Sequence, residues 1–368
     1  MYTQRLSHLI SLLQPAGLDA LALNPGPSLT YLTGLKFHLM ERPVVLLITS
    51  SGQAGIVLAK LEAGKLDGTP LPIEAFTYQD NPESWPAAFQ RASRALNLDQ
   101  KKMGVEPNRL RVLELRYLES AAPGARFLSA ESILSELRIH KEGQEILAIR
   151  QAAQIAQQAL QATLPFIRPG ITEREIAAEL SIQLLRAGSD SDIPFSPIVS
   201  SGPNGANPHA SPSERKLSSG DLLVIDWGAS FQGYCSDITR TFAIGKPEPE
   251  LELIYRVVQE SNAAGRAACR PGIPAGKVDQ AARAVIESSG YGQFFFHRTG
   301  HGLGMEGHEP PYIFSENPLI LSAGMTFTIE PGIYLAGRGG VRIEDNILIT
   351  EDSAESLTDL PRHLLNIG

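Results

Sequence analysis

The first 130 residues alternate between two patterns of apolar side chains. Short continuous apolar runs predict buried strands, and runs with apolar residues three or four positions apart predict amphipathic helices. The expected strands are 18–23, 44–49 and 103–106, and the expected helices are 87–96 and 111–120. This alternation predicts a small α/β domain with a mixed or parallel sheet.

From about residue 140 the chain changes to longer amphipathic helices followed by strands. Thr172 and Glu175 have the spacing of a capping box, which marks the start of a helix. Two strand-like runs surround Glu330 and Glu344. A domain boundary is expected between about 132 and 142. The other expected helices and strands are helices at 142–164, 172–188, 249–268 and 276–289, and strands at 222–230 and 234–244.

The first 17 residues place apolar side chains at helical spacing and interrupt them with polar ones. They therefore predict an amphipathic helix that ends near Pro15 and Gly17, not a signal peptide. No uninterrupted apolar run approaches the roughly 20 residues that span a bilayer. We expect a soluble protein with no membrane segment.

Composition narrows the possible functions. A chain of 368 residues favours two domains. Its net charge of −8 argues against a general nucleic-acid binder, because no basic excess is available to neutralise phosphates. Cys235 and Cys269 have no metal-type spacing and make a disulfide framework unexpected, which fits a cytoplasmic location.

The stretch LVIDWGASFQGYCSDITR, residues 223–240, reads as a buried hairpin that carries Asp226 and Asp237. A two-residue turn at 231–232 would place the two aspartates directly opposite each other. A turn at 232–233, which Gly233 favours, would place them one diagonal step apart. Both registers put the two side chains on the same face of the sheet.

Two carboxylates on one buried face repel each other unless a cation lies between them. Three more candidate ligands follow in the chain. His301 lies in a glycine-rich stretch whose backbone can adopt tight conformations and approach neighbouring segments closely. Glu330 ends a strand-like run, and Glu344 shares a strand face with Arg342.

The resulting set has four carboxylates and one imidazole, and its charge matches two divalent cations. Oxygen ligands with one imidazole suit Mn²⁺, Co²⁺, Fe²⁺ or Zn²⁺. Two ions about 3.5–4 Å apart would make a water molecule reactive near neutral pH. Spacing and composition alone therefore predict a dinuclear hydrolytic site, and no more than that.

The ordered set Asp226, Asp237, His301, Glu330 and Glu344 resembles the M24 metallopeptidases. The strings that carry the resemblance are VIDWGASFQGYCSDITRTF, RTGHGLGMEGHEPP, FTIEPGIY and GVRIEDNILIT. It implies an α/β N-terminal domain over 1–136 and an α+β "pita-bread", or creatinase-like, catalytic domain over 137–368. The N-terminal region looks like that of the Xaa-Pro aminopeptidase and prolidase branch.

The resemblance also implies a role for each matching residue. Asp226 would bind one metal ion, Asp237 and Glu344 would bridge both ions, and His301 and Glu330 would bind the other. Glu330 would also carry the proton of the nucleophile. The resemblance implies further residues around the metal ligands. His209 would assist the leaving proline nitrogen, and His308 would lie near the substrate carbonyl. His297 would belong to the outer part of the site, and Arg342 would orient a ligand carboxylate.

The implied substrates are short proline-containing peptides. A Xaa-Pro bond has no N–H, so its recognition differs from that of an ordinary peptide bond. A dipeptidase must bind the free carboxylate of proline, and Arg298 resembles the arginine that prolidases use for this task. His38 lies where family dimers send a loop toward the neighbouring active site, so a homodimer is expected. These features favour a prolidase, with Mn²⁺ as the expected metal.

Three alternatives remain open from the sequence. The chain could be a Xaa-Pro aminopeptidase acting on longer peptides, a metal-dependent enzyme acting on a small non-peptide molecule, or a binding protein of the same fold. The intact ligand set disfavours the binding protein. The run Phe294–Phe296 is expected to pack in the core more than to line a pocket, for which Tyr312 and Ile313 are further candidates.

Overall fold

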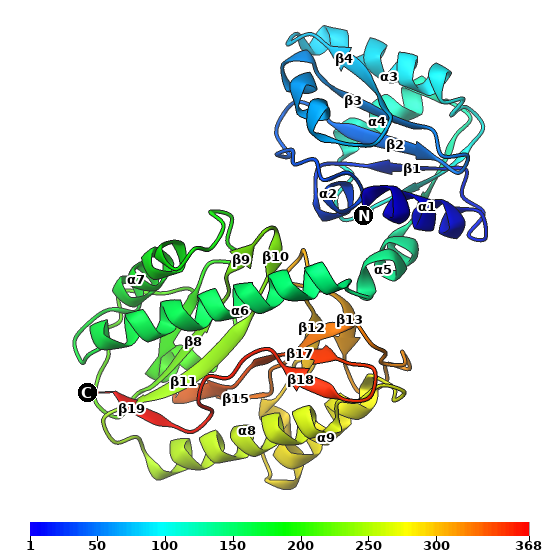
Figure 1. Cartoon of the computed structure of the whole chain (residues 1–368). Helices are drawn as coiled ribbons and strands as arrows, with labels where there is room; N and C mark the ends of the chain where they lie inside the picture. Colours follow the sequence, from blue (N-terminus) through cyan, green and yellow to red (C-terminus); the bar gives the residue numbers. More distant parts are fainter. Residues whose placement is uncertain (368) are drawn as a thin grey trace. The chain divides into compact units, whose positions relative to one another are not determined.

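The computed structural model describes residues 1–367 and divides into two compact units, Met1–Arg138 and Ile139–Gly368. Figure 1 shows the helices and strands of each unit. No helix in the described range is both long and apolar enough to cross a membrane.

The first unit is built on a six-stranded mixed sheet. β1 (Ala20–Leu23) lies between β2 (Val45–Thr49), to which it is antiparallel, and β5 (Lys102–Val105), to which it is parallel. Of the two arrangements expected from the sequence, mixed or parallel, the mixed sheet is the one observed. The outer strands are β3 (Ala54–Ala59), β4 (Ile73–Tyr78) and β6 (Arg126–Ser129), in the order β4-β3-β2-β1-β5-β6.

One face of this sheet is covered by α3 (Trp85–Ala95) and α4 (Val112–Ala121). Trp85 and Phe89 pack there against apolar side chains of the strands. The remaining helices of the unit are α1 (Tyr2–Leu13), α2 (Pro27–Thr33) and α5 (Glu131–Ile139), with 3₁₀ turns η1 (Lys60–Gly68) and η2 (Pro82–Ser84).

The second unit begins with two helices on a four-stranded sheet. They are α6 (Gly143–Thr163) and α7 (Glu173–Arg186), and the expected capping box of Thr172 and Glu175 is present at the start of α7. The sheet has the order β19-β11-β8-β7, with β7 (Ile198–Ser201), β8 (Leu222–Trp227), β11 (Ile238–Ile244) and β19 (Leu365–Ile367). Turns η3 (Leu164–Phe166) and η4 (Gly202–Ala206) connect these elements.

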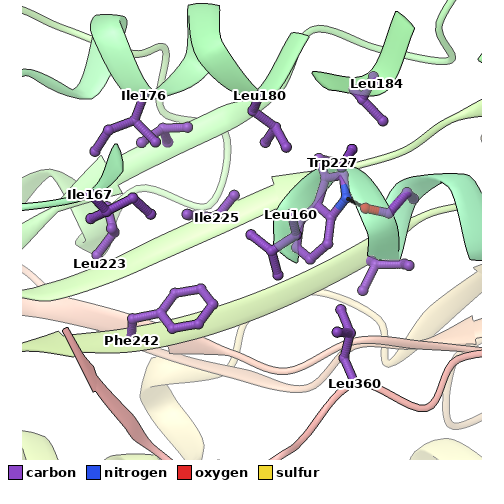
Figure 2. Packing of buried hydrophobic residues seen from close by; sticks show 14 of the residues in the cluster. Leu160, Ile167, Ile176, Leu180, Leu184, Leu223, Ile225, Trp227, Phe242 and Leu360 are labelled. Atoms are coloured by element: carbon purple, nitrogen blue, oxygen red, sulfur yellow. Dashed lines mark hydrogen bonds between the residues drawn. The ribbon is translucent and has the colours of Figure 1, made fainter. Parts of the chain in front are cut away.

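The apolar core beneath α6 and α7 determines which side chains of β8 point toward the helices. Leu223, Ile225 and Trp227 point from β8 toward the helices (Figure 2), and the Trp227 indole donates to the Ala156 carbonyl at 2.8 Å. Because side chains alternate along a strand, Asp226 points to the opposite face. The apolar half of β8 therefore directs its aspartate away from the helical layer.

A second pair of helices covers the other sheet of this unit, so the strands lie between two helical layers (Figure 1). The helices are α8 (Pro249–Ala268) and α9 (Gly276–Ser288), followed by turn η5 (Gly292–Phe294). The five-stranded sheet comprises β13 (Glu309–Ile313), β12 (Gly300–Gly302), β14 (Thr326–Ile329), β17 (Asp345–Ile349) and β18 (Ala354–Ser356). A separate hairpin joins β15 (Gly332–Leu335) to β16 (Gly339–Arg342). This layered arrangement is the pita-bread fold.

The hairpin of the two aspartates turns at Gln232–Gly233, between β9 (Ser230–Phe231) and β10 (Tyr234–Cys235). Both turn residues have positive φ, 53° and 82°, as tight hairpin turns require. The register pairs Asp226 with Thr239, so Asp226 lies one diagonal step from Asp237. The second of the two expected registers is therefore confirmed.

Candidate metal centre

The five ligands expected from the sequence lie together in the second unit. One group consists of Asp226, Asp237 and Glu344, and a second consists of His301, Glu330 and Glu344. Within each group the potential ligand atoms lie no more than 4.8 Å apart. Glu344 belongs to both groups, which is the position of a bridging ligand.

Each of these side chains lies on a short strand or at a strand end. Asp226 is in β8, Asp237 directly precedes β11, and His301 is in β12. Glu330 directly follows β14, as expected. The expected strand through Glu344 is wrong, because β16 ends at Arg342 and Glu344 instead forms an isolated bridge with Thr239.

Three of the carboxylates keep one oxygen paired or close to a neighbour and one oxygen without a partner. Asp226 Oδ2 accepts from Arg342 Nη2 at 2.7 Å, and Glu344 Oε2 accepts from Thr239 Oγ1 at 2.6 Å. Their other oxygens, together with Asp237 Oδ1, are buried without a hydrogen-bond partner. A buried carboxylate oxygen is costly unless it is paired, so the residues present fit bound cations.

The carboxylates strongly affect one another. Burial and neighbouring carboxylates raise the pKa of Asp237 and of Glu344 well above their usual values. Burial raises the pKa of Asp226 as well, although Arg342 opposes this. Burial would also raise the pKa of Glu330, but the hydrogen bond and charge of His301 outweigh it and lower this pKa to about 2. Divalent cations would relieve the repulsion.

His301 is oriented as a ligand through its Nε2 atom. Its Nδ1 lies 3.2 Å from the Gly302 carbonyl, which can only accept, so Nδ1 carries the proton. Its Nε2 lies 3.2 Å from Glu330 Oε1 and 3.6 Å from Asp237 Oδ2. A Cβ at Gly300 would collide with the Thr328 carbonyl, so the expected close approach of the backbone is observed.

His308 and His209 lie beside this centre. The His308 ring lies against the His301 ring at 3.7 Å between centroids and is tilted by 37° to it, and His308 forms a further group with Asp237 and His301. Desolvation and the neighbouring His301 lower the pKa of His308 to about 4. His209 is exposed, and its neighbour Pro208 accepts from Arg342 Nη2 at 3.4 Å. The structure thus brings both histidines to the rim of the site.

Tyr334 links two residues of the site, His297 and Arg342, and was not expected from the sequence. Its hydroxyl lies 2.9 Å from His297 Nε2 and accepts from Arg342 Nη1 at 3.0 Å. His297 Nδ1 lies 2.8 Å from the Arg298 carbonyl and therefore carries the proton, so Tyr334 donates to Nε2. Burial raises the pKa of Tyr334 to about 12, which keeps its hydroxyl protonated.

Two asparagines hold the main chain next to the ligands and were also missed. Asn262 on α8 donates to the carbonyls of Ile329 at 3.1 Å and Ile343 at 3.2 Å, the residues immediately before Glu330 and Glu344. Asn346 accepts from the Asp237 main-chain N–H at 3.1 Å. No pattern within one segment identifies these contacts, because their partners are 67 to 109 positions away.

Arg298 and His38 occupy different parts of the fold. Arg298 lies at the edge of the site with its guanidinium 4.2 Å from the centre of the Tyr312 ring. His38 is exposed in the first unit, outside the groups of potential metal ligands. Of the aromatic run, Phe295 is buried in the core as expected, whereas Phe296 is 65% exposed. Ile313 is buried in another core cluster.

Comparison with known proteins agrees with this geometry. Residues 148–351 match the model of metallopeptidase family M24, and residues 5–140 match the creatinase/prolidase N-terminal domain. The chain belongs to metallopeptidase family M24. It is therefore a peptidase, and its intact set of ligand-type side chains agrees with that membership.

Similar members of family M24 cover nearly the whole chain. The putative dipeptidase YkvY of Bacillus subtilis is 35% identical over 98% of this chain and 99% of its own. The recombinant prolidase of Thermococcus sibiricus has a TM-score of 0.94 at 34% identity, covering 100% of this chain and 99% of that one. The Xaa-Pro dipeptidase of Bacillus anthracis has a TM-score of 0.91 at 32% identity, covering 100% of both chains.

Proposed function

We propose that this M24 peptidase is a prolidase, a dipeptidase that hydrolyses the Xaa-Pro bond with two divalent metal ions. The observation that carries the proposal is the set of three buried carboxylate oxygens without a partner, on Asp226, Asp237 and Glu344. Potential ligand atoms of these three residues lie within 4.8 Å of one another. The dipeptidase and prolidase names of similar proteins support the choice of substrate.

The proposed metal ligands are the five convergent residues. Asp226 would bind one ion, and His301 and Glu330 would bind the other. Asp237 and Glu344 would be ligands of both ions. When bound, the two ions would polarise the scissile carbonyl and activate water. Among O- and N-ligand metals we propose Mn²⁺ as the physiological ion, with Co²⁺, Fe²⁺ and Zn²⁺ as substitutes.

The surrounding side chains would handle protons and substrate. Glu330 accepts the proton of the attacking water. His209 supplies a proton to the proline nitrogen, which has no hydrogen of its own, and His308 donates to the carbonyl oxygen. Arg342 holds Asp226 in place, while His297 and Arg298 receive the proline end of the substrate.

Arg298 favours a dipeptidase over an aminopeptidase. Its guanidinium lies over the Tyr312 ring, and the residue is partly exposed to solvent, so its donors can reach a carboxylate. A free carboxylate directly after proline exists only in a dipeptide. We further propose that the enzyme works in the cytoplasm as a homodimer. In that dimer, the loop with His38 of one protomer would extend toward the active site of its partner.

The test compares hydrolysis of Ala-Pro and Ala-Pro-Ala after metal removal and after restoration with Mn²⁺, Co²⁺ or Zn²⁺. Metal-dependent cleavage of Ala-Pro alone is the expected result. Preference for Ala-Pro-Ala would identify an aminopeptidase, and cleavage of neither peptide would overturn the proposed prolidase function. Glu330→Gln serves as the control, and activity within tenfold of wild type would contradict the role of Glu330.

A further inference from the structure

A buried ion pair on α9 lies outside the set of residues that would touch metal or substrate. Arg283 donates to Asp279 through Nε at 2.9 Å and through Nη2 at 3.0 Å. Asp279 is fully buried, and the Arg283 side chain is 22% exposed. Two charges removed this far from water need further hydrogen bonds to be tolerated.

Those hydrogen bonds go largely to one segment, residues 295–299. Arg283 donates to the carbonyl of Phe295 at 3.0 Å and to that of His297 at 2.8 Å. Asp279 Oδ1 accepts from the Thr299 main-chain N–H at 3.0 Å. The pair thus binds main-chain groups of three alternate residues, as a neighbouring β-strand would.

The same segment carries the residues that face the substrate end of the site. The His297 side chain reaches the Tyr334 hydroxyl at 2.9 Å, and Arg298 lies between the two anchored residues with its guanidinium over Tyr312. Beyond them, the Thr299 carbonyl accepts from the Glu330 main-chain N–H at 2.8 Å. The segment is therefore held from α9 on one side and from the metal centre on the other.

We propose that Asp279 and Arg283 are positioning residues that set the place of His297 and Arg298, and thereby the recognition of the substrate's terminal carboxylate. The proposal rests on the dipeptidase function proposed above. Arg298 acts at the end of a long side chain, so a shift of its main chain moves the guanidinium out of bidentate reach. Displacements of about 1 Å cost roughly 100-fold in comparable sites.

Arg283→Lys is the sharpest variant, because it keeps the charge opposite Asp279 but loses the planar fork that reaches two carbonyls at once. The matched control is Arg150→Lys, which changes an arginine paired with Glu355 at 2.5 Å in the same unit. Each protein is assayed for KM and kcat with Ala-Pro, for inhibition by Ala-Pro amide, which lacks the carboxylate, and for metal content.

The expected result for Arg283→Lys is a rise of about tenfold in KM for Ala-Pro, with the inhibition constant of Ala-Pro amide and the metal content within twofold of wild type. Arg150→Lys is expected to match wild type in all measurements. An unchanged KM, an equal loss of affinity for both compounds, or a variant that fails to fold would overturn the positioning role. Failure of the wild type to cleave Ala-Pro would instead refute the proposed function itself.

Discussion

Arg342 donates a hydrogen bond to Asp226 at 2.7 Å and uses a second nitrogen of the same guanidinium to donate to Tyr334 at 3.0 Å. The Tyr334 hydroxyl in turn donates to His297. A proposed metal ligand and a proposed substrate-binding histidine therefore share one buried chain of hydrogen bonds. Groups linked in this way orient one another.

Tyr334→Phe is expected to lower kcat/KM for Ala-Pro by roughly 10–100-fold, because it leaves Arg342 and His297 without their shared partner. Steady-state kinetics measures the loss. Tyr291→Phe is the matched control, since that hydroxyl makes only a 3.5 Å contact with Glu250 among the contacts described for it. Activity of Tyr334→Phe within twofold of wild type would show that these hydrogen bonds through Tyr334 do not orient the residues of the site.

Arg298→Ala is expected to raise KM for Ala-Pro by roughly 30–100-fold while changing the inhibition constant of Ala-Pro amide little. A charge-assisted bidentate contact contributes about 2–3 kcal/mol, and 1.4 kcal/mol corresponds to a factor of ten. Parallel kinetic assays with the two compounds provide the measurement. An equal effect on both would remove the case for a carboxylate-binding arginine.

Metal removal is expected to lower the melting temperature, and Mn²⁺ is expected to restore it. The cation binds the folded state and separates carboxylates that otherwise repel one another. At a concentration 100 times its Kd, one such ligand stabilises the folded state by about 2.7 kcal/mol. Thermal unfolding with and without Mn²⁺ tests this, and Glu344→Gln should weaken the response. Identical melting curves after chelation would argue against resident ions.

Asn262→Ala is expected to weaken Mn²⁺ binding by roughly 10–100-fold, because the main chain before Glu330 and Glu344 loses its shared anchor. Calorimetric titration of the metal-free protein measures the affinity. Glu260→Ala, an exposed position on the same helix, is the control. An unaltered Mn²⁺ affinity in a folded Asn262→Ala protein would show that Asn262 contributes to packing and does not position the metal ligands.

Asp279→Asn is expected to destabilise the protein by about 3 kcal/mol at pH 7, in the range found when a buried ion pair loses one partner. Burial would raise the pKa of Asp279, but hydrogen bonds from Arg283, Ser315 and Thr299 outweigh it and lower this pKa below its usual value of 3.8. Its contribution is therefore complete above about pH 4 and is lost as the pH falls through the lowered value. Urea unfolding at pH 7 and pH 3 should show the difference between wild type and variant shrinking; a constant difference would contradict the assignment.

Local patterns predicted the elements whose information lies within one segment. The capping box of Thr172 and Glu175 marks the start of α7, and the two-residue period places Asp226 and Asp237 on one face. Short strands escaped prediction. β12, which carries His301, has three residues, too few for any periodicity to be read.

By itself the sequence predicted a set of five ligand-type side chains and the shared sheet face of Asp226 and Asp237, because alternation and turn length are local properties of the backbone. Only the tertiary structure decided which oxygens remain without partners and that Tyr334, Asn262 and Asp279 contact residues in or next to the site. Those facts depend on how separate strands and helices pack. Thr239 meets Glu344 across 105 positions of chain, and no pattern within either segment specifies that contact.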